Sequence, residues 1–598
     1  MQKIWASPNS NPELTPDLQN DLSRKLSLEL NISEKLISLL LQRKIYNYEE
    51  ARKFFRPNLE DIPNPFLMKG MDEAVDRISK AILNNEAILL YGDYDVDGTT
   101  AVSLLYRFLS PLHKSLNYYL PNREKEGYGV SMAGIKWAIE NKIKLIISLD
   151  CGIKSIQEVA FAKENGIDFL ICDHHLPENN LPEALAILNP KQDDCLYPFK
   201  FLSGCGIAYK LAQAYSEKKI GAPLVNNELL DLVAMSIACD LVEVEDENRI
   251  LAFHGLKKLN SNPNSGIESL LKISREKKSL PQSSKPIIQF QDILFQLGPR
   301  INAAGRLGDA HRVVELFTTN NPKLAESISR DLNELNQKRK ELELEITAQA
   351  IAQLVEQVRN SENQYLILGP PGPNNKKAAK CTNVLFNPSW HKGLVGIVAS
   401  RVMEKYYLPT IILTESQNKI TGSARSVEGF NIYEAIHECR HLLEQYGGHS
   451  AAAGLSMAKE NLGLFKEAFE KVVSKIMDGK PSIPKLYYHE ELFLEDITPS
   501  FFRILEQFAP FGPKNPIPQF ITKKIRFSSP AQKIKDIHAK FYIQKGTEVL
   551  TAIGFGLGNL TDHLNYNSDY DICYQIEMNT FRGNSSLQII LKDLILTQ

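Results

Sequence analysis

The chain has 598 residues, which is too long for one hydrophobic core, so roughly two to four domains are expected. A composition of 43% hydrophobic and 23% charged residues excludes a fibrous, collagen-like or disordered chain. The formal net charge of -2 excludes a uniformly basic nucleic-acid coat, although a basic groove could still be offset by acidic residues elsewhere.

Targeting features and cysteine spacing indicate the compartment. The first ten residues lack an apolar stretch typical of a secretory signal, and no apolar run approaches the length of a membrane span. The eight cysteines show neither a CxxC pair nor zinc-type spacing. We therefore expect a cytoplasmic protein in a reducing setting, with no membrane partner.

The N-terminal half opens with short helices and continues as alternating strands and helices. Residues 1–60 predict helices with apolar positions at Leu28, Leu30, Ile37, Leu40 and Leu41. After them, strands are predicted at 87–93, 144–150 and 168–173, with helices at 99–109 and near 154–165. Short apolar strands that alternate with helices indicate a parallel α/β sheet.

The C-terminal half contains a long helix, a second α/β region and a set of short strands. Residues 320–360 have helical apolar spacing, and we interpret them as a bridge between lobes; a surface helix packed on one lobe is the alternative. The segment 369–381 is predicted to be a loop insertion, and 382–457 a second α/β region. Beyond a Lys- and Pro-rich link near 478–485, the short strands predict a small barrel such as an OB-fold.

Three alternating aspartates, Asp93, Asp95 and Asp97, directly follow the first predicted strand. Ligands of open α/β sheets bind beyond the carboxyl ends of the strands. So much negative charge is unfavourable without a cation, and hard carboxylate oxygens suit Mg²⁺ or Mn²⁺. The alternative is an acidic turn that caps the next helix. An EF-hand loop is excluded, because its downstream glutamate is absent.

Acidic residues recur where three further apolar segments end. Asp150 ends the second strand, Asp173 ends the third and is followed by His174 and His175, and Asp240 ends the apolar stretch LVAMSIACD. Imidazole combined with carboxylate favours Mn²⁺ over Ca²⁺, with zinc as the second choice. Two cations that share one carboxylate could activate water and stabilise a phosphoryl transition state.

Together these motifs resemble the RecJ family of exonucleases, within the DHH phosphoesterase superfamily. The DHH-domain motifs are DYDVDG (93–98), SLDCG (148–152), DHH (173–175) and the Asp240 segment, with PNR (121–123) and EGYG (126–129) between the first two. LGPRINAAGRLGDA (297–310) is similar to a family signature. WHKGLVGIVASR (390–401), GSARS (422–426) and GGHSAAAG (447–454) resemble a DHHA1 domain, and APFGPKNPIPQF (509–520) resembles the entry to the family's OB-fold.

The resemblance implies an α/β fold with a parallel-sheet DHH lobe and an α/β DHHA1 lobe joined by a long helix, followed by an OB-like β-barrel. The predicted boundaries are an N-terminal helical segment at 1–60, the DHH catalytic domain at 61–255, its helical extension at 256–319, the connecting helix at 320–360, the DHHA1 domain at 361–457 and the OB-like single-strand-binding domain at 458–598. The insertion at 369–381 is expected to lie outside the active site.

The resemblance also implies a role for each residue of a site with two Mn²⁺ or Mg²⁺ ions. Asp93 and Asp95 would hold one ion, Asp97, His174 and Asp240 the other, and Asp150 would bridge both. His175 would face the scissile phosphate, and Asp173 would orient a neighbouring histidine. The pattern departs at Tyr91, where related pyrophosphatases have a histidine, so one ion is expected to take Asp93 or water instead.

The substrate-side candidates come mainly from the second half of the chain. Glycines and small residues let backbone amides approach an anion, and an arginine can grip a phosphate through two parallel hydrogen bonds. The predicted substrate-binding residues are Arg123, Tyr128, Arg300, Asn302, Arg306, Ser423, Arg425, Gly448 and His449. Ordinary ion pairs, glycine turns and, for Tyr128, a packed aromatic are the alternatives. Basic and aromatic residues are also interleaved in the barrel region, which suits single strands.

The family resemblance implies 5′→3′ degradation of single-stranded DNA to mononucleotides in recombination and repair. Expected partners are single-strand-binding protein and a RecQ-type helicase, and the chain is expected to be monomeric. One alternative is a DHH phosphodiesterase for short oligoribonucleotides or cyclic dinucleotides, which generally needs only the two lobes. A non-catalytic single-strand-binding or scaffold protein is another alternative, but it would need no full set of metal-site acids.

Overall fold

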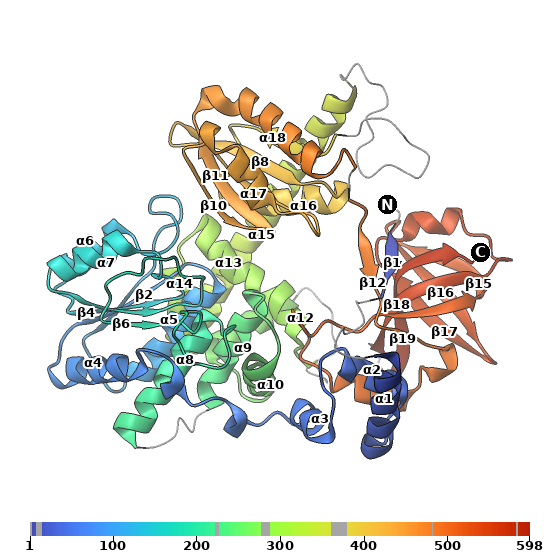
Figure 1. Ribbon diagram of the computed structural model, residues 1–598, viewed down its shortest axis with the longest axis horizontal. Helices are drawn as coiled ribbons and strands as arrows, with labels where there is room; N and C mark the ends of the chain where they lie inside the picture. Colours follow the sequence, from blue (N-terminus) through green and yellow to red (C-terminus); the bar gives the residue numbers. More distant parts are fainter. Residues whose placement is uncertain are drawn as a thin grey trace.

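The computed structural model describes residues 3–7, 15–221, 227–276, 287–359, 380–480, 482–581 and 584–597. Three bodies are arranged around a common centre (Figure 1): a first lobe (65–318), a second lobe (380–477) and a barrel domain (488–597). Most of the predicted insertion, residues 369–379, lies outside the described residues. No helix in the described ranges is both long and apolar enough to cross a membrane.

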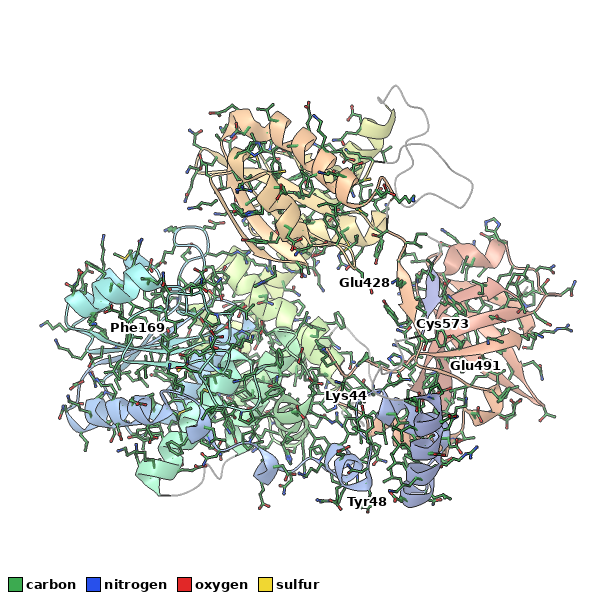
Figure 2. The ribbon with its side chains drawn as sticks, in the orientation of Figure 1. Lys44, Tyr48, Phe169, Glu428, Glu491 and Cys573 are labelled. Carbon is green, nitrogen blue, oxygen red and sulfur yellow. The ribbon has the colours of Figure 1, made fainter. Side chains whose placement is uncertain are left out.

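The first lobe contains the predicted parallel sheet. Its strand order is β3-β2-β4-β5-β6, with β2 Ile88–Gly92, β3 Leu116–Tyr119, β4 Leu145–Leu149, β5 Asp168–Cys172 and β6 Ala186–Leu188. Alternate residues of β2 enter different cores, because Ile88 packs with one helix layer and Leu89 with the other. Phe169, labelled in Figure 2, is buried inside this lobe. Helices therefore cover both faces, as the apolar strands predicted.

Helices of the first lobe lie on the two faces and beyond the sheet. One face carries α4 Met71–Leu83, α5 Val96–Leu109, α8 Gly204–Tyr215 and α9 Leu230–Cys239, and the other carries α6 Met132–Glu140 and α7 Ile156–Glu164. The helices beyond are α10 Asp246–Ser261, α11 Ser265–Arg275, α12 Phe290–Asp292, the π-helical turn η5 Ile293–Leu297, α13 Gly298–Leu307 and α14 His311–Thr318. The segment before Asp240 is thus a helix, and Asp240 is its C-cap.

The long helix forms as predicted and connects the two lobes. It is α15, Pro322–Arg359. Ile328 and Leu332 are buried in the core of the first lobe, whereas Ile346 and Leu354 pack with the first helix of the second lobe, α16 Val395–Tyr406. Its two ends therefore belong to different cores, which confirms the bridge.

The second lobe extends beyond the predicted boundary at residue 457. Its sheet has the order β10-β11-β9-β8-β7, from β7 Asn383–Phe386, β8 Thr410–Ser416, β9 Lys419–Arg425, β10 Gln445–His449 and β11 Ala452–Met457. The helices α17 Ile432–Glu438 and α18 Leu462–Ile476 pack into the same core as this sheet. Because Phe465 and Phe469 of α18 are fully buried there, this helix belongs to the second lobe and not to the barrel.

The barrel domain closes through one bent stretch of chain. Its sheet order is β13-β14-β18-β19-β17-β16-β15, from β13 Glu490–Glu491, β14 Phe520–Ile525, β15 Phe527–Ile534, β16 His538–Lys545, β17 Glu548–Gly554, β18 Tyr570–Phe581 and β19 Asn584–Leu596; the helix α19 Pro499–Glu506 lies between β13 and β14 in the chain. Only Arg526 separates β14 from β15, which lie near opposite ends of that order. The Phe527 ring packs 5.4 Å from Phe541 and 5.5 Å from Tyr570, so these strands share one interior.

The N-terminal segment packs against the barrel, at the far end of the sequence. It contains β1 Ile4–Ala6, α1 Pro16–Leu30, α2 Glu34–Leu41 and α3 Tyr48–Phe55, and β1 pairs in parallel with β12 Lys485–Tyr487. Leu26, Leu36 and Ile37 share one core with barrel residues. The predicted apolar position Leu28 is wrong, since 84% of its surface is exposed and Leu26 is buried instead.

Arg249 of α10 joins the first lobe to the barrel and to the N-terminal helices. Its guanidinium donates to the carbonyls of Phe508 at 2.9 Å, Pro510 at 3.5 Å, Gln507 at 3.3 Å and Phe54 at 3.2 Å. It also lies 3.8 Å from the centre of the Phe54 ring. No described acidic residue pairs with Arg249, so these carbonyl dipoles and the ring stabilise the buried charge.

We expect Arg249→Met to lower the free energy of unfolding at the barrel interface by about 2 kcal/mol. Four carbonyls lose a charged donor, and this loss is partly offset because the guanidinium no longer has to be buried. The three tryptophans include Trp5, which donates to Asp593 of the barrel domain at 2.9 Å. Urea unfolding followed through Trp5, in a chain with Trp137 and Trp390 changed to phenylalanine, measures this loss. Arg52→Met, which removes an exposed arginine paired with Glu49, is the control; equal midpoints for the two variants would contradict the assignment.

Candidate metal centre

The predicted acidic residues meet where β2, β4 and β5 end. Asp93, Asp150 and Asp173 directly follow these neighbouring parallel strands, and all three side chains are buried. Asp150 adopts a left-handed backbone with φ +61°, and Gly204 approaches so closely that a Cβ there would lie 2.6 Å from the Cβ of Asp150. Such constrained backbone is typical of functional sites.

Asp97 is fixed by the N-terminus of α8. Its carboxylate accepts the backbone N–H of Gly204 at 2.7 Å and of Cys205 at 2.8 Å, and the hydroxyl of Ser236 at 2.6 Å. The positive end of the helix dipole favours the ionised carboxylate at this position. Asp97 is thus held rigidly beside the other acids.

His174 lies at the centre of the cluster. Its Nε2 is 3.2 Å from Asp150 Oδ1, 3.4 Å from Asp240 Oδ2 and 3.8 Å from Asp97 Oδ2. Two groups have potential ligand atoms within 4.8 Å of one another, namely Asp97–His174–Asp240 and Asp150–His174–His175. The structure therefore brings together most of the residues predicted to hold metal.

Asp93 and Asp95 are close by but, in the described part of the chain, belong to neither group. Asp95 is the N-cap of α5 and accepts the N–H of Gly98 at 3.1 Å, as the helix-capping alternative predicted. Burial and the charge of Asp95 raise the pKa of Asp93 well above its usual value. Both residues remain placed at the edge of the site.

His175 is oriented by Asp173. Its Nδ1 is 2.7 Å from Asp173 Oδ1, and the same carboxylate accepts the N–H of Ile153 at 3.0 Å. Burial opposes protonation of His175, but the hydrogen bond and charge of Asp173 outweigh it and raise the pKa of His175. The Tyr128 hydroxyl lies 3.1 Å from His175 Nε2 and contacts the Asp150 carbonyl. Tyr128, although 56% exposed, is thus in contact with the site.

The unpartnered atoms of the site fit divalent cations. Burial, followed by the charges of Asp97 and Asp95, raises the pKa of Asp150 and of Asp240. Burial lowers the pKa of His174 to about 4, which leaves it as the neutral imidazole that binds metals. Among the described residues, Oδ1 of Asp150 and both ring nitrogens of His174 have no hydrogen-bond partner. Oxygen ligands with one or two imidazoles suit Mn²⁺ and also accommodate Mg²⁺.

Tyr91, which stands where related pyrophosphatases have a histidine, points away from this centre. Its side chain is fully buried and stacks on Tyr119 with ring centres 5.2 Å apart. The backbone N–H of Ser131 donates to the Tyr91 hydroxyl at 3.0 Å. Tyr91 therefore supports the loop that carries Tyr128 and supplies no ligand.

Arginines from both lobes line the space beside the acids. Arg123 lies 5.2 Å above the Tyr94 ring. Burial, followed by the nearby charge of Arg123, lowers the pKa of both Arg306 and Arg425, that of Arg306 to about 10. Arg306 donates to the carbonyl of Gly393 in the second lobe at 3.0 Å. Positive charge from two lobes is thus concentrated next to the metal centre.

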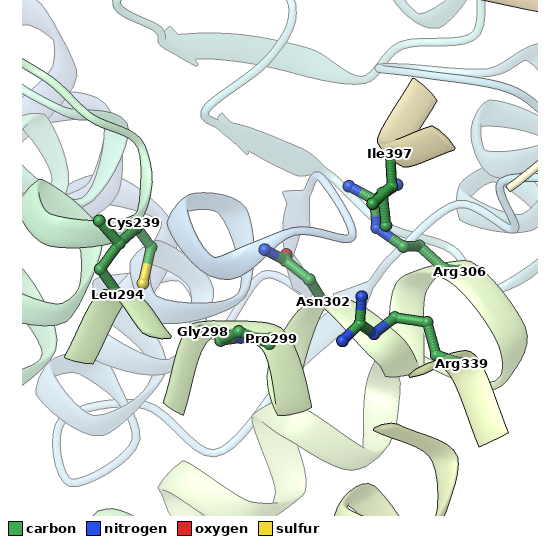
Figure 3. A pocket seen from close by; sticks show the side chains of 8 residues that line it. All are labelled: Cys239, Leu294, Gly298, Pro299, Asn302, Arg306, Arg339 and Ile397. Carbon is green, nitrogen blue, oxygen red and sulfur yellow. The ribbon is translucent and has the colours of Figure 1, made fainter. Parts of the chain in front are cut away.

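A pocket of about 160 Å³ opens next to these arginines (Figure 3), between α13 and the second lobe. Asn302, Arg306 and Arg339 line its polar side, whereas Cys239 and Leu294 line the opposite end. Arg300 is not part of it, because its side chain donates to Asn333 of α15 at 3.1 Å. The geometry therefore favours the ordinary structural role for Arg300.

The predicted second-lobe residues lie side by side on three strands. His449, Ala452 and Arg425 are paired across β10, β11 and β9. Arg425 donates to the Ser423 hydroxyl at 2.8 Å. Gly448 has φ +144°, and a Cβ there would meet the backbone oxygen of Ala452 at 2.3 Å, so glycine is required for this close pairing of β10 with β11.

Sequence reasoning missed several groups that complete the site. Ser236 and the amides of Gly204 and Cys205 hold Asp97, and the SGCG stretch at 203–206 was the available signal. Arg339 was missed because the charged sequence QKRK in a long helix is typical of a solvated face. In the structure it pairs with Glu343 at 2.6 Å and lines the pocket.

Three protein families match successive parts of the chain. Residues 87–237 match the DHH family, N-terminal domain, residues 376–475 the DHHA1 domain, and residues 488–593 the RecJ OB domain. The second match includes α18, in agreement with its packing in the second lobe.

Two curated relatives are similar to this chain over nearly its whole length. The single-stranded-DNA-specific exonuclease RecJ of Bacillus subtilis is 33% identical over 572 residues, which cover 95% of this chain and 69% of that protein. That of Dickeya dadantii is 31% identical over 576 residues, covering 93% and 96%.

Solved structures match as well. RecJ of Thermus thermophilus in complex with Mn²⁺ has a TM-score of 0.80 at 24% identity, covering 100% of this chain and 80% of that one, and shows the shared fold. An exonuclease RecJ bound to manganese has a TM-score of 0.56 at 29% identity, covering 69% and 96%.

Proposed function

Since the chain belongs to the RecJ family, we propose that it is a metal-dependent exonuclease that degrades single-stranded DNA from 5′ to 3′ and releases 5′-mononucleotides in recombination and repair. The observation that carries the proposal is the convergence of Asp97, Asp150, His174 and Asp240, where Asp150 Oδ1 and both ring nitrogens of His174 are buried with no hydrogen-bond partner among the described residues. A binding or scaffold protein has no use for such a centre.

We assign two divalent cations, Mn²⁺ or Mg²⁺, to this centre. Asp97, His174 and Asp240 would hold one, Asp93 and Asp95 would serve the other, and Asp150 would be shared. When bound, the cations supply Lewis acidity that activates water and offsets charge on the phosphate.

The chain's own groups then position the substrate. His175, held through Nδ1 by Asp173, presents Nε2 to the scissile phosphate in place of its contact with Tyr128. Arg123, Arg306 and Arg425 would hold phosphates of the strand, and Asn302 would line the same path. Cleavage next to a bound 5′ end would release single nucleotides, and the second strand of a duplex would obstruct the approach.

We further propose a cytoplasmic monomer that acts together with single-strand-binding protein and a RecQ-type helicase, which would supply the single strand. Analytical ultracentrifugation and binding to each purified partner test this part of the proposal separately from the chemistry.

The decisive experiment is product analysis on single strands labelled at either end, with Mn²⁺ or Mg²⁺. A 5′ label should appear at once as a mononucleotide, whereas a 3′ label should remain on progressively shorter strands. Duplex DNA of the same sequence is the control. Mononucleotides that carry the 3′ label first would reverse the polarity, and cleavage of a dinucleotide alone would favour the short-oligonucleotide alternative.

We expect Arg425→Ala to lower kcat/KM about tenfold to a hundredfold on a 5′-phosphorylated strand, because one or two charge-assisted hydrogen bonds to the terminal phosphate are lost. The loss on a 5′-hydroxyl strand should be much smaller. Arg440→Ala removes an exposed arginine that donates to the nearby His437 carbonyl at 3.1 Å, and it serves as the control. An equal loss on both strands would mean that Arg425 grips the strand generally and does not read its end.

A further inference from the structure

An apolar groove of about 200 Å³ lies beside the chain segment that carries Asp240. It is lined by Leu241, Phe290, Phe295, Phe511, Pro513 and Ile517, among others. Apart from Gln291, the described residues that line it carry apolar side chains or, at Gly512, none. The groove thus lies between the first lobe and the loop that enters the barrel domain, near α12 in Figure 1.

The groove adjoins the arginine-lined pocket. Leu294 lines both this groove and the arginine-lined pocket, where Figure 3 shows it beside Cys239. Ala238 and Leu241 line the groove and Cys239 lines the pocket, so both cavities include chain neighbours of the metal-site residue Asp240. The groove extends from these neighbours to the loop at 511–517, which precedes β14.

Two unusual backbone features present its apolar side chains. Leu241 has a left-handed backbone with φ +56°, which is unfavourable for a leucine, yet 55% of the residue is exposed. Phe295, 70% exposed, stands on the π-helical turn η5, a rare conformation that is frequent at functional sites. Neither feature is explained by core packing of these two side chains, since both remain accessible.

The floor of the groove is rigid. The N–H of Val244 donates to the Pro513 carbonyl at 2.8 Å, and a Cβ at Gly512 would meet the Val244 side chain at 2.5 Å. Asn515 donates to the carbonyls of Phe508 and Pro510 at 2.9 and 2.7 Å. The exposed rings and Leu241 are therefore held on a preformed surface.

We propose that this groove binds nucleobases of the single strand, on the 3′ side of the cleaved phosphate and ahead of the barrel. The inference rests on the proposed function, which supplies a single strand whose 3′ part extends beyond the metal centre. Unpaired bases bind apolar and aromatic surfaces without sequence preference, which fits a groove that has almost no polar groups. Its role is to hold the strand in register after each nucleotide is released.

The first test measures binding without turnover. Fluorescence anisotropy with an oligothymidine, in EDTA, should show Phe295→Ala binding about fivefold to a hundredfold more weakly than the unaltered chain, as expected for the loss of one base contact. A dinucleotide should bind both proteins equally, since it ends before the groove. Leu83→Ala, which removes an 82% exposed leucine at the end of α4, is the control. Equal binding of the long strand by Phe295→Ala would overturn the proposal, whether or not the chain is a nuclease.

A second measurement locates the contact. One abasic nucleotide is moved along a 5′-phosphorylated strand, and kcat/KM is measured at each position. The unaltered chain should lose activity at one or two internal positions near the 5′ end, and Phe295→Ala should lose this dependence. Leu241→Gly should melt no lower than the unaltered chain, because glycine relieves the left-handed backbone, and yet bind the strand more weakly. An identical abasic profile in Phe295→Ala would refute the groove, whereas failure of the unaltered chain to shorten any strand would refute the nuclease.

Discussion

Replacing Asp150 by alanine should lower the rate of strand cleavage by at least about a thousandfold, even at saturating Mn²⁺, because a carboxylate shared by two cations contributes several kcal/mol to the transition state. Asp150 Oδ1 is buried, has no hydrogen-bond partner in the described ranges and lies 3.2 Å from His174 Nε2. Water in its place would neither carry charge nor stay fixed. Cleavage rates and Mn²⁺ titration by calorimetry measure the two effects.

Thermal melting separates loss of metal from loss of fold. Burial and neighbouring aspartates raise the pKa of Asp150, so near neutral pH its ionised form destabilises the metal-free protein. Metal-free Asp150→Asn should therefore melt above the metal-free unaltered chain, while its gain on adding Mn²⁺ should be smaller. Asp194→Ala, an exposed carboxylate paired with Lys69 at 2.6 Å, should change neither property. Unimpaired turnover in Asp150→Ala at saturating Mn²⁺ would exclude the shared-ligand assignment.

Replacing each of the two adjacent histidines by alanine should impair a different property, metal binding for His174 and the rate of cleavage for His175. His174→Ala should mainly weaken metal binding, because its neutral imidazole lies among three carboxylates. His175→Ala should mainly lower kcat, by about a hundredfold to ten-thousandfold, since its Nδ1 is held by Asp173 and its Nε2 is directed outward. Mn²⁺ titration and single-turnover rates on both variants measure the split.

Asp173→Asn and His437→Ala complete this comparison. Asp173→Asn should resemble His175→Ala in kind but be milder, because the imidazole remains while its orientation and raised pKa are lost. His437, which contacts the Tyr446 hydroxyl in the second lobe, provides a histidine outside the site. Because His175 also lies within the group formed with Asp150 and His174, equal loss of metal in His174→Ala and His175→Ala would identify both as ligands.

The acidic edge of the first sheet was predictable because each aspartate motif directly follows a strand that the apolar pattern had identified. Parallel strands end at one edge, so aspartates that follow β2, β4 and β5 had to meet. Asp240 reaches the same place from a helix, since the apolar run before it is buried on all sides and does not have to be a strand. Periodicity alone does not separate a buried helix from a buried strand.

Arginines were harder to place than aspartates. Arg300 and Arg306 belong to the same motif, yet one bonds to α15 and the other faces the pocket, because helical residues six positions apart point in different directions. Arg339 has the sequence context of a solvent-facing helix and becomes part of the pocket because α15 packs against α13. Contacts between bodies are set by tertiary packing, for which a single sequence carries no local signal.

The pairing of the N-terminal helices with the barrel has a consequence for synthesis on the ribosome. Leu26, Leu36 and Ile37 emerge before the two lobes, but the residues that share their core, such as Phe501 and Phe520, are translated after both lobes. Throughout translation of the two lobes, this apolar surface has no native partner and is open to non-native association. A nascent chain stalled before the barrel should therefore recruit a chaperone through its first sixty residues and release it once the last strand is complete.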